Sequence, residues 1–262
     1  GGGNMAGALI GGLRRAGTAA ADLLAVEIDA ARRAALERDF GIATAEAPDA
    51  RLARFDVLVL AVKPQQMKSA CAALAPHVGA QLVLSVAAGI RARDLARWLN
   101  TQAVVRAMPN TPALIGRGIS GAAALAGASD AQREAAEKVL RAVGEVVWFA
   151  DEAQLDAVTA VSGSGPAYVF YFIEALIDAG RELGFTEAQA RALAIATFTG
   201  AAELAARSAE PVAVLRERVT SKGGTTAAAL ASLERDGVRA AIVRAVAAAE
   251  RRAVELGDEF GA

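Results

Sequence analysis

Small residues at the start of the chain have a spacing that could hold a dinucleotide. In "GGGNMA", Gly1, Gly3 and Ala6 fit the pattern G-x-G-x-x-G/A. A helix that starts beside Asn4 would point its N-terminal amides at a pyrophosphate. The alternative is an ordinary glycine loop without a ligand.

Two acidic residues follow at the distance where a dinucleotide-binding strand meets the adenosine ribose. Glu27 and Asp29 in "LLAVEIDAARR" hold these positions, and both would disfavour a 2′-phosphate and favour NADH. Arg32 and Arg33 on the following helix could instead bind that phosphate and favour NADPH. We therefore expect both cofactors to work. In the alternative interpretation, Asp29 only caps the helix over residues 30–41.

A second glycine-rich segment, "SKGGTT", covers Ser221 to Thr226 and calls for a different anion. It lacks the pattern of a nucleotide P-loop, and it precedes a helix whose free amides suit a single carboxylate. The hydroxyls of Ser221, Thr225 and Thr226 would be further partners. The alternative is structural, with Thr225 or Thr226 as the helix N-cap after a glycine turn.

Three further segments could line a cleft at the carboxyl ends of strands. "LVLAVKP" ends a strand at Lys63 and starts a helix at Pro64, "SVAAGI" ends the next, and "RAMPNTP" places Asn110 in a proline-fixed loop. "VSGSGPAYVF" opens a long helix near Pro166. The alternatives are a solvated lysine at Lys63, an ordinary rigid turn around Asn110, and a helix kink or a close helix crossing at the glycines before Pro166.

The elements that position these residues divide the chain in two. Short apolar runs predict strands within residues 23–28, 55–62, 81–87, 103–108, 118–125 and 145–150, with helices between them, which favours a parallel sheet covered on both faces. We predict an α/β fold, with a Rossmann-type dinucleotide-binding domain over 1–150 and an all-α dimerisation domain over 151–262. A glycine turn of this type needs a strand feeding it, so we expect a missing strand upstream of Gly1.

The composition of the chain indicates which kinds of binding partner to expect. A formal net charge of −1 over 262 residues gives no reason to expect a nucleic acid or an anionic membrane. The longest uncharged run, 157–173, is interrupted by glycines and Pro166, so no membrane span is predicted. A mean hydropathy of +0.33 favours a homo-oligomer. Cys71 is predicted to be a core residue and His77 a surface residue. No Cys, His or Asp cluster has the spacing of metal ligands, and a single cysteine is consistent with a reducing, cytoplasmic location.

Taken in order, "GGGNMA", "LAVKP", "VRAMPNTPA", "SGSGPAYVF" and "SKGGTT" resemble pyrroline-5-carboxylate reductases along essentially the whole chain. The resemblance implies NADPH or NADH as cofactor, 1-pyrroline-5-carboxylate as substrate, and a dimer that is often assembled into a decamer. It implies that the cofactor-binding residues are Gly1, Gly3, Asn4, Met5, Ala61, Val62, Lys63, Pro64, Ala87, Ala88 and Gly89. Their positions in the sequence add Glu27 and Asn110 to the predicted cofactor-binding residues. The implied substrate-binding residues are Ser164, Gly165, Ser221, Gly223, Gly224, Thr225 and Thr226. Lys222 departs from the family pattern, since many members have proline there.

The implied reaction is hydride transfer to the C=N carbon of a cyclic imine, giving proline. No histidine or paired carboxylate lies in any motif, so we expect orientation to dominate. The imine would arrive protonated or be hydrogen-bonded by Thr226, the predicted catalytic residue, without a dedicated strong general acid. Two other classes remain open: a 6-phosphogluconate or hydroxy-acid dehydrogenase, which would carry a catalytic lysine on a helix, and a non-catalytic dinucleotide-binding regulator.

Overall fold

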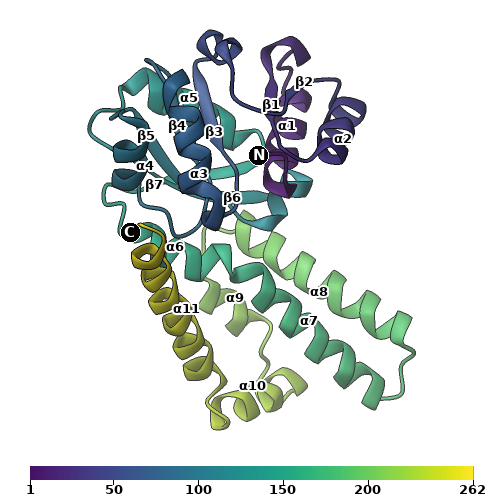
Figure 1. Cartoon of the computed structure of the whole chain (residues 1–262). Coiled ribbons are helices and arrows are strands. Elements are labelled where there is room, and N and C mark those ends of the chain that lie inside the picture. The colour runs from purple at the N-terminus through teal and green to yellow at the C-terminus, as the bar shows by residue number, and fades with distance from the viewer. Residues whose placement is uncertain (262) are drawn as a thin grey trace. The chain divides into compact units, whose positions relative to one another are not determined.

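The computed structural model describes residues 1–261, which form two compact units (Figure 1). The α/β unit contains Gly1–Ser164 and the end of the chain from Ala248, and the helical unit contains Gly165–Ala247. The predicted division at residue 150 falls just after the last strand, which ends at Trp148. The compact units divide later, after Ser164.

The main sheet of the α/β unit has the strand order β3-β4-β5-β6-β7. Its strands are β3 (Val57–Leu60), β4 (Leu82–Ser85), β5 (Val104–Met108), β6 (Gly118–Ala124) and β7 (Gly144–Trp148). Strands β3, β4 and β5 run parallel, as expected, and β6 pairs with β7 in parallel. The prediction of an all-parallel sheet is wrong at β6, which is antiparallel to β5. The β5–β6 connection, residues 109–117, is too short for the crossover that a parallel pair needs.

A second sheet pairs β1 (Leu24–Val26) with β2 (Ala43–Ala45) in parallel. Helix α2 (Ala30–Phe40) connects them, and Ala25, Leu36 and Ile42 form a small core of their own. The sequence predicted β1 and α2 but not β2.

Helices cover both faces of the main sheet. On one face, α3 (Pro64–Leu74) and α4 (Ala92–Leu99) pack their apolar side chains against β3, β4 and β5. On the other, α1 (Asn4–Arg15) and α5 (Asp130–Arg141) do the same. The near-continuous apolar runs of the strands follow from this burial, since all of β4 is enclosed. Short 3₁₀ turns lie at Ala20–Asp22, Ala50–Arg54, Ala75–His77 and Thr111–Ile115.

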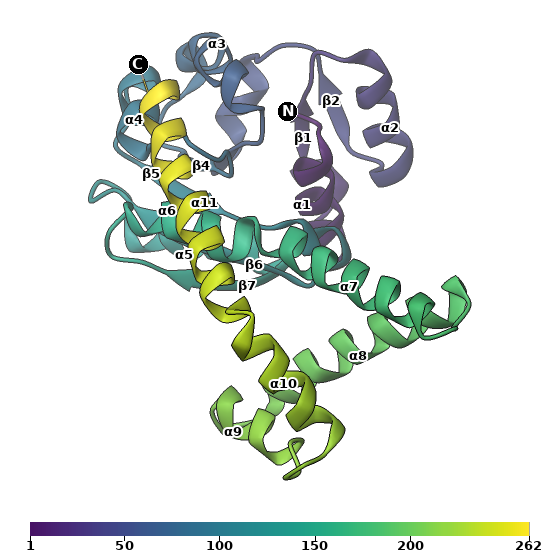
Figure 2. The ribbon, with the colours of Figure 1, turned by 90° about the horizontal axis from the view of Figure 1, so that it is seen from below.

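The chain then continues as α6 (Gln154–Val158), a π-helical turn over Thr159–Gly163, and α7 (Gly165–Glu182). The helical unit also contains α8 (Glu187–Arg207), α9 (Val212–Arg218), α10 (Thr225–Arg235) and the first part of α11 (Val238–Phe260), up to Ala247. The last turns of α11 lie beside α4 (Figure 2), where Arg91 Nη2 and Asp258 Oδ1 are 2.6 Å apart. Capping boxes at Ser129 and Thr186 begin α5 and α8.

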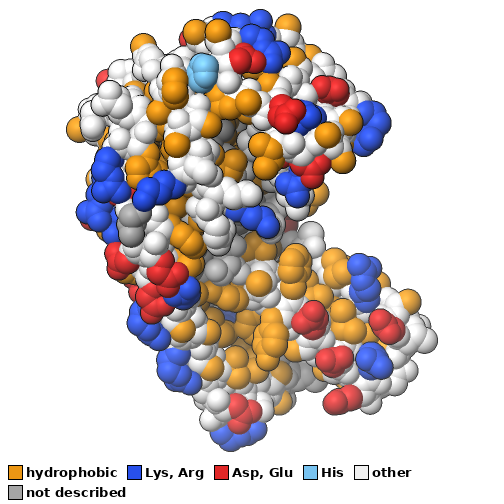
Figure 3. Space-filling view, viewed as in Figure 1, with side chains coloured by type: hydrophobic (Ala, Val, Ile, Leu, Met, Phe, Trp, Pro, Cys, Tyr) orange, Lys and Arg blue, Asp and Glu red, His pale blue; other side chains and the backbone are white. Residues whose placement is uncertain are grey.

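The helical unit exposes large apolar side chains. Phe170, Tyr171 and Leu193 are 60%, 72% and 55% exposed. Figure 3 shows hydrophobic side chains gathered over this part of the molecule. By length and composition alone, one helical stretch among the described residues, Gln154–Glu182, could span a membrane.

Candidate functional site

The glycine loop lies where the two sheets of the α/β unit end. The Gly1 nitrogen is 2.8 Å from the carbonyl oxygen of Val26, at the end of β1. A β-carbon on Gly1 would lie 2.8 Å from the carbonyl oxygen of Ala61, and one on Gly2 would lie 2.9 Å from a methyl of Leu36. No larger residue fits at either position without moving a neighbour, so the structure explains both glycines.

Helix α1 begins directly after this loop with its first amides available. Gly3 is the N-cap in an extended conformation, no side chain of residues 1–261 caps the helix, and its first turn carries no acid. A β-carbon on Gly3 or Gly7 would meet nothing within 4 Å. Open space in front of uncapped amides at a positive helix end fits a pyrophosphate.

Glu27 holds the glycine loop through backbone contacts. Its Oε2 accepts a hydrogen bond from Gly2 N–H (2.5 Å) and its Oε1 accepts one from Asp29 N–H (2.9 Å), while the residue is 7% exposed. Burial acts to raise the pKa of this carboxyl, but the Asp29 and Gly2 amides and nearby positive charge, including Arg32, outweigh it, so the pKa lies below its ordinary value. The carboxylate therefore stays ionised and shapes the loop.

After Glu27, the side chains of Asp29 and Arg33 are hydrogen-bonded to backbone groups, whereas the side chain of Arg32 is exposed. Asp29 caps α2 by accepting from the N–H groups of Ala31 (2.8 Å) and Arg32 (3.1 Å) through Oδ1. Arg33 Nη1 donates to the carbonyl oxygens of Glu27 (2.7 Å) and Ile28 (2.9 Å). The Arg32 side chain is 56% exposed. A groove of about 350 Å³ is lined by Arg32 together with Gly2, Gly3, Asn4, Gly7 and Leu36, among others.

Two further predicted segments lie at the carboxyl ends of β3 and β4. Lys63 is the exposed N-cap of α3, and Pro64 is its first residue, as predicted. In the β4–α4 loop, Gly89 has a φ of +70°, and a β-carbon there would lie 3.2 Å from Leu256 and 3.3 Å from Phe260. Ala87 and Gly89 are both buried, and Gly89 lies against the last turns of α11.

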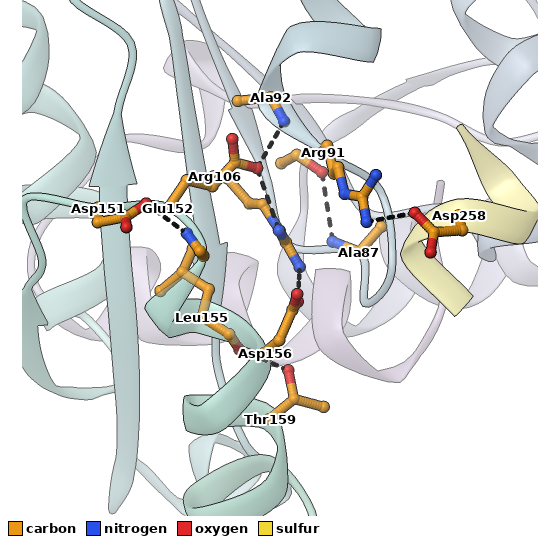
Figure 4. A network of polar contacts seen from close by, with 12 residues as sticks. Ala87, Arg91, Ala92, Arg106, Asp151, Glu152, Leu155, Asp156, Thr159 and Asp258 are labelled. Carbon is orange, nitrogen blue, oxygen red and sulfur yellow. Dashed lines mark hydrogen bonds and ion pairs between the residues drawn. The ribbon is translucent and has the colours of Figure 1, made fainter. Parts of the chain in front are cut away.

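Sequence reasoning missed a buried ion-pair network behind this loop (Figure 4). Arg106 on β5 has a side chain 3% exposed, with Nη1 at 3.1 Å from Glu152 Oε1 and Nη2 at 3.0 Å from Asp156 Oδ1. Glu152 Oε1 also accepts from Ala92 N–H (2.7 Å), at the start of α4. An arginine within the apolar strand "AVVRAM" was the available signal, because a buried guanidinium needs carboxylate partners.

Asn110 also makes its contacts with backbone. Its Nδ2 donates to the carbonyl oxygen of Ser162 (3.2 Å), and its Oδ1 accepts from Ile119 N–H (3.0 Å). The residue is 9% exposed. Asn110 therefore joins the end of β5 to the start of β6 and to the π-helical turn.

In the helical unit, "SKGGTT" forms the turn before α10. Gly223 has a φ of +70°, and Gly224 N–H donates to the carbonyl oxygen of Ser221 (3.0 Å). The N-cap of α10 is Gly224, so the alternative that Thr225 or Thr226 is the N-cap is wrong. No side chain within the described part of the chain caps this helix, and its first turn carries no acid. Uncapped amides beside two hydroxyls suit a carboxylate.

Each unit brings together its own share of the predicted residues. In the α/β unit, the carboxyl ends of β1, β3, β4 and β5 carry Gly1 to Met5, Glu27, Ala61 to Pro64, Ala87 to Gly89, and Asn110. The helical unit contains Gly165, at the start of α7, and Ser221 to Thr226; Ser164 ends the α/β unit. Among residues 1–261, no cluster of His, Cys, Asp or Glu could hold a metal ion. Burial raises the pKa of the Cys71 thiol to about 11, which fits a core residue.

The glycine loop, the uncapped start of α1 and the acid after β1 define a Rossmann-type protein that binds a nicotinamide dinucleotide, which is the class of the NAD(P)-dependent oxidoreductases. Residues 1–89 match the family model described as "NADP oxidoreductase coenzyme F420-dependent". Residues 152–256 match the model described as "Pyrroline-5-carboxylate reductase dimerisation". The chain belongs to the pyrroline-5-carboxylate reductase family, which confirms the resemblance seen in the motifs.

Similar proteins cover the chain almost completely. A pyrroline-5-carboxylate reductase from Pseudomonas aeruginosa is 48% identical over 100% of this chain and 96% of its own length. One from Synechocystis is 42% identical over 98% and 96%. The structure of a Coxiella burnetii pyrroline-5-carboxylate reductase matches with a TM-score of 0.91 at 38% identity, over 98% and 96% of the two chains. A Plasmodium falciparum pyrroline carboxylate reductase with NADP bound matches with a TM-score of 0.86 at 29% identity, over the same shares.

Proposed function

We propose that this chain reduces 1-pyrroline-5-carboxylate to L-proline with NADPH or NADH, the last step of proline biosynthesis. Family membership over the full length supports the proposal. The observation that carries it within this chain is the uncapped start of α10, because an oxidoreductase acting on a carboxylate needs an anion site separate from the one for its dinucleotide.

The dinucleotide residues follow from the geometry at the strand ends. The amides of Gly3, Asn4 and Met5 would bind the pyrophosphate, and Gly1 allows the backbone to approach Ala61 closely. Glu27 would hold the loop in this conformation and contact the adenosine ribose with the free lone pairs of its oxygens. The remaining residues, Val62, Lys63, Pro64, Ala87, Ala88 and Gly89, would line the rest of the cofactor site.

The substrate residues follow from "SKGGTT". The amides of Thr225 and Thr226 and the hydroxyl of Ser221 would bind the carboxylate of the imine, and the backbone of Gly223 and Gly224 lets this turn form. The hydroxyl of Thr226 would hydrogen-bond the ring nitrogen. The backbone and hydroxyl of Ser164, followed by Gly165, would add further contacts.

The reaction needs placement more than acid catalysis. When bound, the reduced nicotinamide would supply a hydride to the C=N carbon of the protonated imine; the ring nitrogen would keep that proton, and the products would be a secondary amine and the oxidised cofactor. Orientation can lower such a barrier by roughly 7–11 kcal/mol, whereas one positioned hydroxyl contributes about 1–3 kcal/mol. The residues at both sites are mainly glycine, alanine, serine and threonine, which bind and orient.

Assembly and location complete the proposal. The chain forms a homo-oligomer through its dimerisation region. We propose that the exposed apolar side chains of α7 and α8 bind a second copy, that dimers assemble further into a decamer, and that the protein acts in the cytoplasm without a nucleic-acid or membrane partner. A dimer interface accounts for the apolar surface of 154–182 without a bilayer.

One assay separates this proposal from the other classes. Oxidation of NADPH or NADH is followed by absorbance with pyrroline-5-carboxylate as substrate. Reduction of NADP or NAD is followed in the same way with 6-phosphogluconate and with a short 2-hydroxy acid. We expect turnover with the cyclic imine alone. Turnover with a hydroxy acid would identify a dehydrogenase, and dinucleotide binding without any turnover would identify a regulator.

A further inference from the structure

The helix that leads from α6 into α7 is not regular. Residues Thr159–Gly163 form a π-helical turn, in which Ser164 N–H donates to the carbonyl oxygen of Thr159, five residues back (2.8 Å). The sequence supplies a cause. In an α-helix the Ser162 carbonyl would accept from the N–H of residue 166, which is proline; proline has no N–H, and its ring crowds the carbonyl four residues earlier. Such π-helical turns occur frequently at functional sites.

A side chain from another part of the α/β unit supplies the missing donor. Asn110 Nδ2 donates to the Ser162 carbonyl oxygen at 3.2 Å. The same side chain accepts from Ile119 N–H at 3.0 Å, which fixes which end of the carboxamide faces Ser162. Because Asn110 is 9% exposed, water is a poor substitute for either contact.

The chemistry at this position is specific to a carboxamide. It requires a donor and an acceptor on one short side chain, and asparagine has both. Aspartate has the same shape but only accepts when ionised, so it would keep the Ile119 contact and direct an oxygen at the Ser162 carbonyl oxygen. Alanine would leave both backbone groups without this partner.

We infer that Asn110 is a positioning residue whose carboxamide replaces the N–H that Pro166 lacks, and so holds the turn that ends at Ser164. This role differs from the cofactor contact that the sequence predicted for Asn110. It rests on the proposed function in one respect, namely that Ser164 and Gly165 contact the substrate. The bonding itself depends on the geometry alone.

The test is a double-mutant cycle of Asn110→Asp and Pro166→Ala. Asn110→Asp alone should raise the KM for pyrroline-5-carboxylate by about tenfold and leave the Kd for NADPH, measured by fluorescence quenching, within about twofold. Pro166→Ala restores an N–H at position 166. In that background Asn110→Asp should therefore cost much less than it does alone. Asn100→Asp, the same chemical change at an exposed helix end, is the matched control and should change neither constant.

A second measurement does not depend on activity. Hydrogen exchange at the amides of residues 159–164 should be faster in Asn110→Asp than in the wild type and in Asn100→Asp, and the added Pro166→Ala should slow it again. A raised Kd for NADPH with an unchanged KM would show that Asn110 contacts the cofactor. Additive effects in the cycle, or unchanged exchange, would show that Asn110 does not replace the missing N–H. A wild type that fails to reduce the imine would refute the proposed function, while the exchange data would still decide the role of Asn110.

Discussion

Replacing Arg106 by methionine should destabilise the α/β unit strongly. The Arg106 side chain is 3% exposed and contacts two carboxylates, at 3.0 Å and 3.1 Å. Asp156 is 11% exposed, so without the guanidinium its charge would stay buried with no cation beside it. Removing one partner of a buried pair typically costs about 3–5 kcal/mol, because the remaining charge has lost its water and gained nothing.

This free energy converts to a measurable shift in Tm. For a unit of this size each kcal/mol lowers Tm by about 2–4 °C, so Arg106→Met should lower it by roughly 6–20 °C. Thermal and urea unfolding followed by circular dichroism would measure the change. Wild type and variant must be compared at one protein concentration, since assembly also stabilises the fold.

Two controls make this prediction sharp. Arg91→Met removes an arginine paired with Asp258, which is 67% exposed, so it should cost at most about 1 kcal/mol. Adding Asp156→Leu to Arg106→Met removes the unpaired charge and should recover most of the lost stability. The reasoning would be refuted if Arg106→Met cost no more than Arg91→Met, or if the double variant were less stable than Arg106→Met alone.

Four further predictions concern the two sites. Arg32→Ala should weaken NADPH binding by about 10- to 100-fold and NADH binding little, since a charge-assisted contact contributes about 1.5–3 kcal/mol; fluorescence titration would measure both, and an equal loss for the two cofactors would place Arg32 away from the 2′-phosphate. Thr226→Ala should weaken transition-state binding of the imine by ~1–3 kcal/mol, measured as a lower kcat/KM, and should leave the cofactor affinity unchanged. Lys222→Ala should have a smaller effect than Thr226→Ala. It should raise the KM for the imine by an amount that shrinks at high ionic strength. The pKa of Glu27 lies below its unfolded value of 4.5, so its contribution to stability is present above that pH and is lost as the pH falls through the folded pKa; Glu27→Gln should flatten this acid limb in urea unfolding at a series of pH values.

Burial explains which elements the sequence could predict. Strand β4 is enclosed on both faces, so its run of apolar residues is visible without any structure. Strand β2, Ala43–Ala45, is three residues long and contains two alanines, so pairing with β1 makes it a strand rather than its own propensity. The direction of β6 was also hidden, because apolar periodicity is the same in parallel and antiparallel strands. The only indication was the length of the β5–β6 connection: its nine residues, 109–117, are too few for the crossover that a parallel pair needs.

Distance along the chain explains which site residues the sequence could predict. The glycine loops could be found because their function depends on local spacing. The partners of Arg106 lie 46 and 50 residues away, and those of Asn110 lie 52 and 9 residues away. The sequence shows a charge in an apolar strand and an asparagine between two prolines, but only folding determines which groups they meet.

The starts of the helices suggest how one chain accommodates two anions. Side chains of Asp29, Ser129 and Thr186 cap α2, α5 and α8, and the first amide of α4 is bonded to Glu152.

Helices α1 and α10 instead begin after Gly3 and Gly224; like α3 and α9, which begin after Lys63 and Pro211, they have no side-chain cap in the described part of the chain. A capping side chain typically contributes about 1 kcal/mol, so the free protein forgoes this stability at both positions. At Gly3 steric hindrance is not the reason, since a β-carbon there would meet nothing within 4 Å. A serine at Gly3 could cap α1, but its hydroxyl would compete with a phosphate for the same amides. We therefore infer that the missing caps are completed by the ligands, with the dinucleotide at α1 and the carboxylate of the substrate at α10.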